Sequence, residues 1–246
     1  MKEPMEVLKK YKASLEAEGY KVLYIGLYGS QNYQVSDEKS DIDAKVIVLP
    51  SVEDIVFRKI TSKVKEFDEG TCDIKDLITY YNVVRKGNFS FIEPFYTNWY
   101  IGDEYIRKLF RQIPVNKKSL FGGMCEKQKA FTHEYPSKKE EFEKFGCDPK
   151  QYHHVVRLYD IVLTLEPDKE LFIPYLTYDG FNQTHMKEIK RGLCGRTKEE
   201  LIDDIEEMVA DAKVIISKQE PYQERDFSVE VGNYLKEKLK EGLLND

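Results

Sequence analysis

The sequence YIGLYGSQNYQVSDEKSDIDAKVIVL, from Tyr24 to Leu49, decides the fold of this chain. It predicts a buried strand that ends at Gly29, then a polar turn or short helix, and then a second strand entered through Asp41-Ile42-Asp43. Alternate residues of the second strand are apolar and predict a face packed on a core: Ile42, Ala44, Val46 and Val48.

Asp41 and Asp43 lie on the opposite face of this predicted strand. Because they are two residues apart, their side chains leave the same face, with Cα atoms roughly 6.6 Å apart at about 3.3 Å per residue. Like charges in this arrangement repel each other, and a hard cation bound to both would relieve the repulsion. The pair therefore predicts a site for one or two divalent cations, the alternative being a solvated strand edge or a helix cap.

Gly29 and Ser30 come directly after the first predicted strand. Glycine allows a backbone conformation that is closed to other residues, and it lets a ligand approach the main chain closely. Ser30 adds a hydroxyl group and opens a helix-like turn whose N–H groups can bind a phosphate. The sequence thus predicts a phosphate-binding turn followed, after ten residues, by a metal-binding acid pair.

Gly29-Ser30 followed by Asp41-Ile42-Asp43 resembles the signature of the DNA polymerase β-type nucleotidyltransferases. Within that superfamily the chain is most similar to the predicted nucleotidyltransferases associated with RNA repair. The likeness runs from about Gly19 to Ala210. One difference is Asn88-Phe-Ser90, where many relatives have Asn-Pro-Asn. Three segments carry the closer resemblance: Gly29-Ser-Gln-Asn-Tyr33, Lys86-Gly-Asn-Phe-Ser-Phe-Ile-Glu93 and Lys150-Gln-Tyr-His-His-Val-Val-Arg157.

The resemblance implies a third carboxylate on a later strand, and Asp73 is the natural match, with Asp76 as its competitor. Asp41, Asp43 and Asp73 would then be the catalytic residues and would hold two Mg²⁺ or Mn²⁺ ions. The implied reaction transfers a nucleoside monophosphate from a nucleoside triphosphate to an acceptor hydroxyl and releases pyrophosphate. Asp73 would bind the ion that activates this hydroxyl and help to remove its proton.

Lys150, His154 and Arg157 share one face of a predicted helix, since they stand at positions i, i+4 and i+7. From the spacing alone they are either a solvated basic face with a core histidine or a set of phosphate ligands. The resemblance favours the second interpretation, in which Lys150 and Arg157 hold the β- and γ-phosphates. Gly29 and Ser30 complete the expected nucleotide-binding set.

The predicted fold is α/β, with a small mixed sheet flanked by helices (residues 1–115, the catalytic domain) and a helical domain that closes over the nucleotide (residues 116–246). Helix starts are predicted at Ser51, Asp148 and Thr197. A short strand carrying Asp73 is expected to give way to a helix at about Ile74 or Lys75. The aromatic segment from Phe89 to Tyr100 is either core or a surface for stacking bases.

The chain has 246 residues, a formal net charge of −6 and four widely spaced cysteines. It has no apolar run near the roughly 20 residues that a membrane span needs, so we expect a cytoplasmic protein with free thiols. The charge gives no support for a large nucleic-acid footprint. The acceptor is therefore left open between an RNA 3′ end, a protein side chain and a small molecule. Two further alternatives are a nucleotide-binding regulatory module without turnover and a member of a toxin–antitoxin pair.

Overall fold

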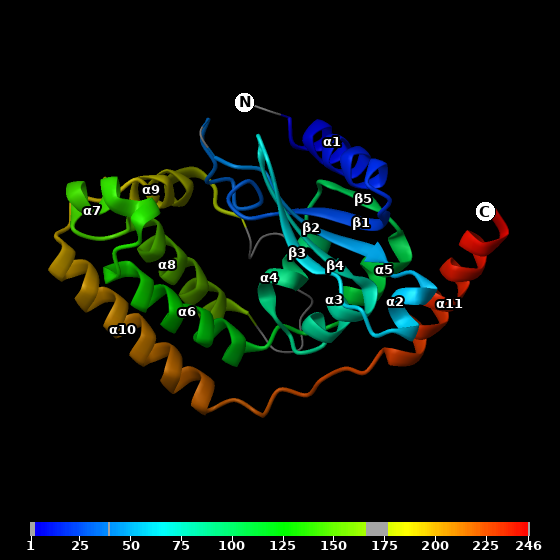
Figure 1. Cartoon of the computed structure of the whole chain (residues 1–246). Helices are drawn as coiled ribbons and strands as arrows, with labels where there is room; N and C mark the ends of the chain where they lie inside the picture. Colours follow the sequence, from blue (N-terminus) through cyan, green and yellow to red (C-terminus); the bar gives the residue numbers. More distant parts are fainter. Residues whose placement is uncertain (1–2, 39, 166–176, 246) are drawn as a thin grey trace. The chain divides into compact units, whose positions relative to one another are not determined.

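The computed structural model describes residues 3–38, 40–165 and 177–245 (Figure 1). Contacts divide the chain into two compact units. The first unit contains Met1–Asn32, Ser36–Pro114 and Gln223–Asp246, and the second contains Tyr33–Val35 and Val115–Tyr222. The main change of unit thus falls between residues 114 and 115, while residues 223–246 group with the first unit. The roles of the two predicted domains, in catalysis and in closing, stay predictions.

The first unit is built on a five-stranded mixed sheet with the order β3-β4-β2-β1-β5 (Figure 1). β1 pairs antiparallel with both β2 and β5, β2 pairs parallel with β4, and β3 pairs antiparallel with β4. The predicted α/β class with a small mixed sheet is confirmed. The strands are β1 (Lys21–Tyr28), β2 (Asp43–Leu49), β3 (Ser62–Phe67), β4 (Gly70–Asp76) and β5 (Tyr100–Gly102).

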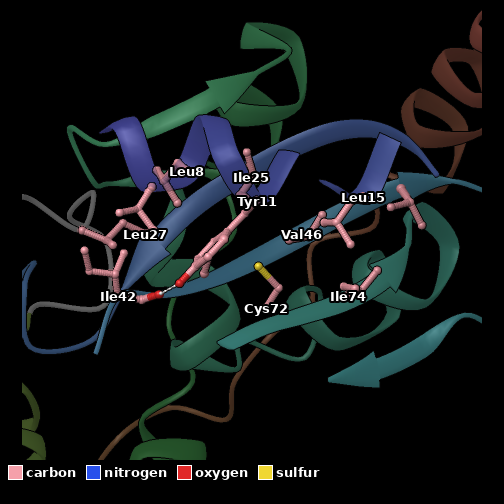
Figure 2. Close-up of a cluster of buried hydrophobic side chains, with 12 residues drawn as sticks. Leu8, Tyr11, Leu15, Ile25, Leu27, Ile42, Val46, Cys72 and Ile74 are labelled. Atoms are coloured by element: carbon pink, nitrogen blue, oxygen red, sulfur yellow. Dashed lines mark hydrogen bonds between the residues drawn. The ribbon is translucent and has the colours of Figure 1, made fainter. Parts of the chain in front are cut away.

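Helix α1 (Pro4–Ala17) packs on one face of this sheet through an apolar stripe. Figure 2 shows Leu8, Tyr11 and Leu15 of the helix facing the strands. The predicted apolar face of β2 is confirmed, because its alternate residues all belong to this cluster. The cluster also contains Ile42, directly before β2, and the strand residues Ile25, Leu27, Ala44, Val46, Val48, Cys72 and Ile74.

The opposite face of the sheet is covered by short helical elements from the middle of the chain. The Tyr24 hydroxyl donates a hydrogen bond to the Pro94 carbonyl at 2.8 Å, and its ring packs on Phe95. Phe89, Phe95 and Tyr96 are buried, so the core interpretation of the aromatic segment is confirmed for these residues. The covering elements are α3 (Leu77–Val84), α4 (Phe89–Ile92), η1 (Glu93–Phe95) and α5 (Glu104–Phe110).

The predicted boundary between the strand of Asp73 and the following helix was wrong by two to three residues. β4 continues to Asp76, and α3 begins only at Leu77. Ile74 and Lys75 remain extended because they pair with Val46 and Ile47 of β2 on one side and with β3 on the other. Tertiary pairing thus overrides the local helical pattern.

The second unit is helical, and its two predicted helix caps are present. Asp148 accepts a hydrogen bond from the Lys150 backbone N–H, with Pro149 in the first turn. Thr197 and Glu200 form a capping box, as Ser51 and Asp54 do for α2 (Val52–Val56) in the first unit. The helices are α6 (Lys117–Thr132), α7 (Lys139–Phe145), α8 (Pro149–Thr164), α9 (Gly180–Lys190) and α10 (Lys198–Ser217), with a short turn η2 (Pro136–Lys138).

Helix α11 (Ser228–Asn245) belongs to the first unit. The Tyr81 hydroxyl donates to Asp226 at 3.0 Å and accepts from the Phe227 backbone N–H at 2.7 Å. Within α11, the Tyr234 hydroxyl donates to Asp103 at 2.9 Å. These bonds attach the helix to α3 and to the start of α5.

Two further expectations concern the chemistry of the whole chain. All four cysteines are free thiols, as predicted, and Cys72 and Cys147 are buried. Over the residues described, no helix has both the length and the apolar character to cross a bilayer.

Candidate functional site

The Gly29–Ser30 turn follows β1 directly, and its glycine is required by the backbone. Gly29 has φ +91°, a conformation that other residues rarely adopt, although open space surrounds the position of a Cβ. Asn32 N–H donates to the Gly29 carbonyl at 2.9 Å and closes the turn. Residues 30–34 form turns and no regular helix. Gly29 is thus needed for the backbone conformation of the turn.

The Glu93 side chain holds this turn in place, although Glu93 comes 64 residues after Gly29 in the sequence. Its carboxylate accepts the Gly29 N–H at 2.9 Å and the Asn32 side-chain amide at 3.2 Å. The Thr97 hydroxyl donates to the Asn32 side chain at 2.7 Å, and the same Asn32 also donates to the Leu27 carbonyl. Glu93 is only 1% exposed, and the Gly29 N–H is already used by a protein acceptor.

Helix α1 and the β3–β4 turn hold the Asp41-Ile42-Asp43 segment. The Tyr11 hydroxyl donates to the Ile42 carbonyl at 3.0 Å (Figure 2). The Ile42 N–H donates to the Glu69 carbonyl at 2.7 Å. Gly70 has φ +152°, and a Cβ there would lie 2.5 Å from the Ile42 carbonyl oxygen, so this close approach requires glycine. The peptide groups between the two acids are therefore fixed on both sides.

Asp43 and Asp41 differ in their surroundings. Asp43 is the first residue of β2 and is half-buried, whereas Asp41 precedes the strand and is exposed. Asp43 Oδ1 accepts hydrogen bonds from the Thr71 backbone N–H at 3.0 Å and from the Thr71 hydroxyl at 2.7 Å. Within the part of the chain that the structure describes, no hydrogen bond reaches Asp43 Oδ2.

Asp73 lies on β4 and is engaged by two lysines. In the parallel pairing of β2 with β4 it stands opposite Lys45, so the two side chains share a face. Lys45 Nζ lies 2.7 Å from Asp73 Oδ2, and Lys75 Nζ lies 3.0 Å from Asp73 Oδ1. The two ammonium groups together engage both oxygens of the carboxylate. We refer to the face that carries Asp43, Lys45, Thr71, Asp73 and Lys75 as the acid face.

The protonation state of Asp73 follows from these contacts. Burial by itself raises the pKa of this carboxyl, but the hydrogen bonds and charges of Lys45 and Lys75 outweigh it and hold the pKa below its usual value. A carboxylate with a lowered pKa is a weaker general base, which disfavours the expected role of Asp73 in removing a proton.

Asp76, the alternative third carboxylate, is the N-cap of α3. It accepts hydrogen bonds from the Thr79 N–H and the Thr79 hydroxyl, and from the Thr61 N–H. It is 4% exposed, and its two oxygens are used by the protein. Of the two candidates, Asp73 is therefore the one that shares a face with Asp43.

Asp41 and Asp43 fit a hard divalent cation better than Asp73 does. Carboxylate oxygens are the ligands that Mg²⁺ and Mn²⁺ prefer, and Asp43 keeps one oxygen without a protein donor. Asp73 offers no such oxygen. Across the described ranges, no three His, Cys, Asp or Glu side chains form a group able to hold a metal ion. The three-carboxylate set is thus not assembled here, and its role in metal binding stays a prediction.

Lys150, His154 and Arg157 all lie on α8, in the second unit, with different exposures. Lys150 is exposed, His154 is half-buried, and Arg157 is 5% exposed. The Arg157 guanidinium lies over the Tyr33 ring, 3.2 Å from its centre. Burial, and then the nearby His153, lower the pKa of His154 well below its usual value. Lys150 is thus the most accessible of the three expected phosphate ligands.

His153, which precedes His154 on α8, is 1% exposed. Burial, followed by the charges of Arg157, Lys190 and Lys150, lowers the pKa of its imidazole to about 3. Neither ring nitrogen has a hydrogen-bond partner among the described residues. His153 is therefore a neutral core residue.

Sequence reasoning missed Glu93 and Thr71 as parts of the candidate site. Glu93 entered only as the end of a segment of the resemblance, and its contact with Gly29 joins residues that are far apart in the sequence. Thr71 had no pattern of its own, although it stands two residues before Asp73, and both residues lie on β4. That period-two spacing is the signal that would have placed it on the acid face.

The chain shows little similarity to known proteins. No protein-family model and no curated protein sequence matches this chain. A crystal structure of a nucleotidyltransferase-like protein from Exiguobacterium sibiricum 255-15 matches over 87% of this chain and 74% of that one, at 12% identity. The TM-score of this match is 0.31, which is too low for the likeness to carry an argument about fold or activity.

Proposed function

We propose that this chain transfers a nucleoside monophosphate from a nucleoside triphosphate to an acceptor hydroxyl, with a divalent cation held by Asp41 and Asp43. The acceptor oxygen forms a bond to the α-phosphorus, the bond from that phosphorus to the pyrophosphate oxygen breaks, and the hydroxyl proton passes to solvent. The products are the nucleotidylated acceptor and pyrophosphate.

The observation that supports this proposal most is the meeting of the glycine turn and the acid pair at one edge of the sheet. Tyr28, the last residue of β1, pairs with Asp43, the first residue of β2. The Gly29–Ser30 turn therefore leaves the sheet beside the point where the acids enter it. A phosphate-sized group near this turn is thus close to carboxylates that can share a cation with it.

Phosphoryl transfer depends mostly on positioning and charge neutralisation. The residues at this edge of the sheet can supply both. A bound Mg²⁺ or Mn²⁺ would neutralise charge on the reacting phosphate oxygens. Thr71 orients Asp43, and Tyr11 holds the peptide between the two acids. We assign the Ser30 hydroxyl to a phosphate oxygen, because the Gly29 N–H is used by Glu93.

In the second unit, we assign phosphate binding to Lys150 first, because it is exposed. A role for His154 and Arg157 in contacting phosphate requires the two side chains to become accessible. For the acceptor we propose an RNA 3′ end, on the strength of the family resemblance alone. The net charge of −6 keeps a protein hydroxyl or a small molecule as the alternatives to be separated by experiment.

The test is transfer of label from each of the four α-³²P-labelled nucleoside triphosphates, with Mg²⁺ or Mn²⁺, into RNA, protein and small-molecule fractions. The variant is Asp41→Asn/Asp43→Asn, in which each side chain keeps its size. The matched control is Asp203→Asn, an exposed acid of α10. We expect label in one fraction, a loss of at least about 100-fold in the double variant and no change in the control.

Equal label transfer by the wild type and the double variant would contradict the proposal. Binding of the triphosphate without any transfer would favour a nucleotide-binding module without turnover. One observation favours this second candidate: the carboxylate of Asp73 is already neutralised by Lys45 and Lys75.

A further inference from the structure

Lys45 lies between the candidate cation ligands and Asp73, on the acid face. Its ammonium group is 4.4 Å from the centre of the Tyr28 ring and 4.3 Å from the centre of the Phe91 ring. Together with the ion pair to Asp73, these two cation–π contacts surround the group, and the residue is only 6% exposed. A charge enclosed in this way is a fixed part of the face.

Lys75 binds the other carboxylate oxygen of Asp73. Its ammonium group bonds to Asp73 at 3.0 Å and to the Ser62 hydroxyl at 3.0 Å, and it lies 5.2 Å from the centre of the Phe91 ring. The two lysines thus share one aromatic ring and one carboxylate. A metal ion at Asp73 would therefore either displace an ammonium group or share a carboxylate oxygen with it.

Both routes are unfavourable, and the first removes Lys45 from its contacts. The Lys45 ammonium group would lose its contacts with both rings and with its only carboxylate partner among the described residues. The aliphatic part of the side chain starts from a strand that is buried on both faces. Sharing of an oxygen would instead place a third cation around one carboxylate, and the cations would repel one another in surroundings of low dielectric. The protein cation and a second metal ion are therefore alternatives at this position.

We propose that the site holds one divalent cation, at Asp41 and Asp43, and that Lys45 of the acid face occupies the place of a second ion beside Asp73. The inference rests on the proposed function, because it concerns the cation of that same site. In this arrangement Asp73 is a positioning residue for Lys45, whose fixed charge lies two residues from Asp43 on the same strand face.

The experiment counts Mn²⁺ ions bound to the full chain by electron paramagnetic resonance, with Mn²⁺ alone and with a non-hydrolysable nucleoside triphosphate analogue. We expect one bound ion per chain in both conditions. Asp43→Asn should weaken Mn²⁺ binding at least tenfold, whereas Asp73→Asn should leave the affinity within about twofold of wild type. Asparagine at position 73 keeps the shape of the side chain.

Lys45→Met tests the other half of the inference, because it removes the protein cation and keeps the length of the side chain. We expect a second Mn²⁺ ion in this variant and no second ion in the matched control Lys63→Met, at a lysine of β3, the strand next to β4. If Lys45→Met does not fold, as judged by circular dichroism, the wild-type count and Asp73→Asn still decide the question.

The outcomes separate this inference from the proposed function. Two ions in the wild type, with one lost in Asp73→Asn, would overturn the inference and leave the proposed transfer reaction standing. No bound ion in either condition would overturn both. One ion that depends on Asp43 and not on Asp73 supports the inference.

Discussion

The two faces of the central sheet differ in what they bury. The face under α1 encloses an apolar cluster whose one hydroxyl, that of Tyr11, bonds to the Ile42 carbonyl (Figure 2). The opposite face buries charged groups, among them Lys45 and Glu93, which are 6% and 1% exposed. The sheet thus has an apolar core on one side and buried charged groups, from β2 and from η1, on the other.

This difference indicates that the faces have separate tasks. Apolar burial stabilises the folded state without directional requirements, whereas buried charges are costly unless each is paired. Lys45 is paired with Asp73, and Glu93 accepts from Gly29 and Asn32. The α1 face should therefore control stability, and the opposite face should control the shape and charge of the site.

The largest expected effect on stability is that of Leu15→Ala on the α1 face. Leu15 is fully buried in the apolar cluster, so the truncation should lower the free energy of unfolding by about 2–5 kcal/mol. Urea denaturation measures this loss, and Leu163→Ala, at a half-exposed leucine of α8, is the control, with a smaller expected loss. Label transfer per folded molecule should stay within about twofold of wild type. A selective loss of transfer would show that the two faces do not act separately.

Glu93→Gln should have a smaller effect on stability and a measurable effect on the site. Glutamine can still accept the Gly29 N–H, but it lacks the charge and brings a donor group into a buried position, so we expect a loss of about 1–3 kcal/mol. The turn should loosen, which raises the KM for the triphosphate. Steady-state kinetics and urea denaturation measure the two effects, with Glu140→Gln, an exposed residue of α7, as control. An unchanged KM would contradict a positioning role for Glu93.

The smallest effect concerns acid pH and Asp73. The folded-state pKa of this carboxyl is below its usual value of 3.8, so the unfolded state binds more protons as the pH falls. The stability that Asp73 contributes is therefore fully present above pH 3.8 and is lost as the pH falls through the folded pKa. Unfolding free energies of wild type and Asp73→Asn should differ most near neutral pH and converge below pH 3.8. A difference that does not depend on pH would contradict the ion pairs with Lys45 and Lys75.

Local signals predicted much of the fold. Capping residues at Ser51, Asp148 and Thr197 lie within three residues of the groups that they bond, so the sequence alone identified these helix starts. The alternation along β2 likewise predicted its core face. The end of β4 was missed because Ile74 and Lys75 are held extended by strands that are distant in the sequence.

The candidate site was predicted only in part, because some of its contacts join residues that are distant in the sequence. Glycine and paired aspartates mark the sheet edge by residue type and spacing, and the register of β1 with β2 brings them together. Lys45 binds a carboxylate of the same face. Its partner Asp73 and its enclosure by Tyr28 and Phe91 depend on contacts between separate elements, which no local pattern records.

The attachment of α11 to the first unit has a consequence for synthesis on the ribosome. Tyr81 and Asp103 receive their partners Asp226 and Tyr234 only after the whole of residues 115–222 has been made. At roughly 5–20 residues per second, this leaves the surface of α3 and α5 uncovered for about 5 to 20 s. The helical second unit can fold during that interval, whereas the sheet unit is completed last. A fragment ending at residue 115 would retain the sheet and lack the helix that covers this surface.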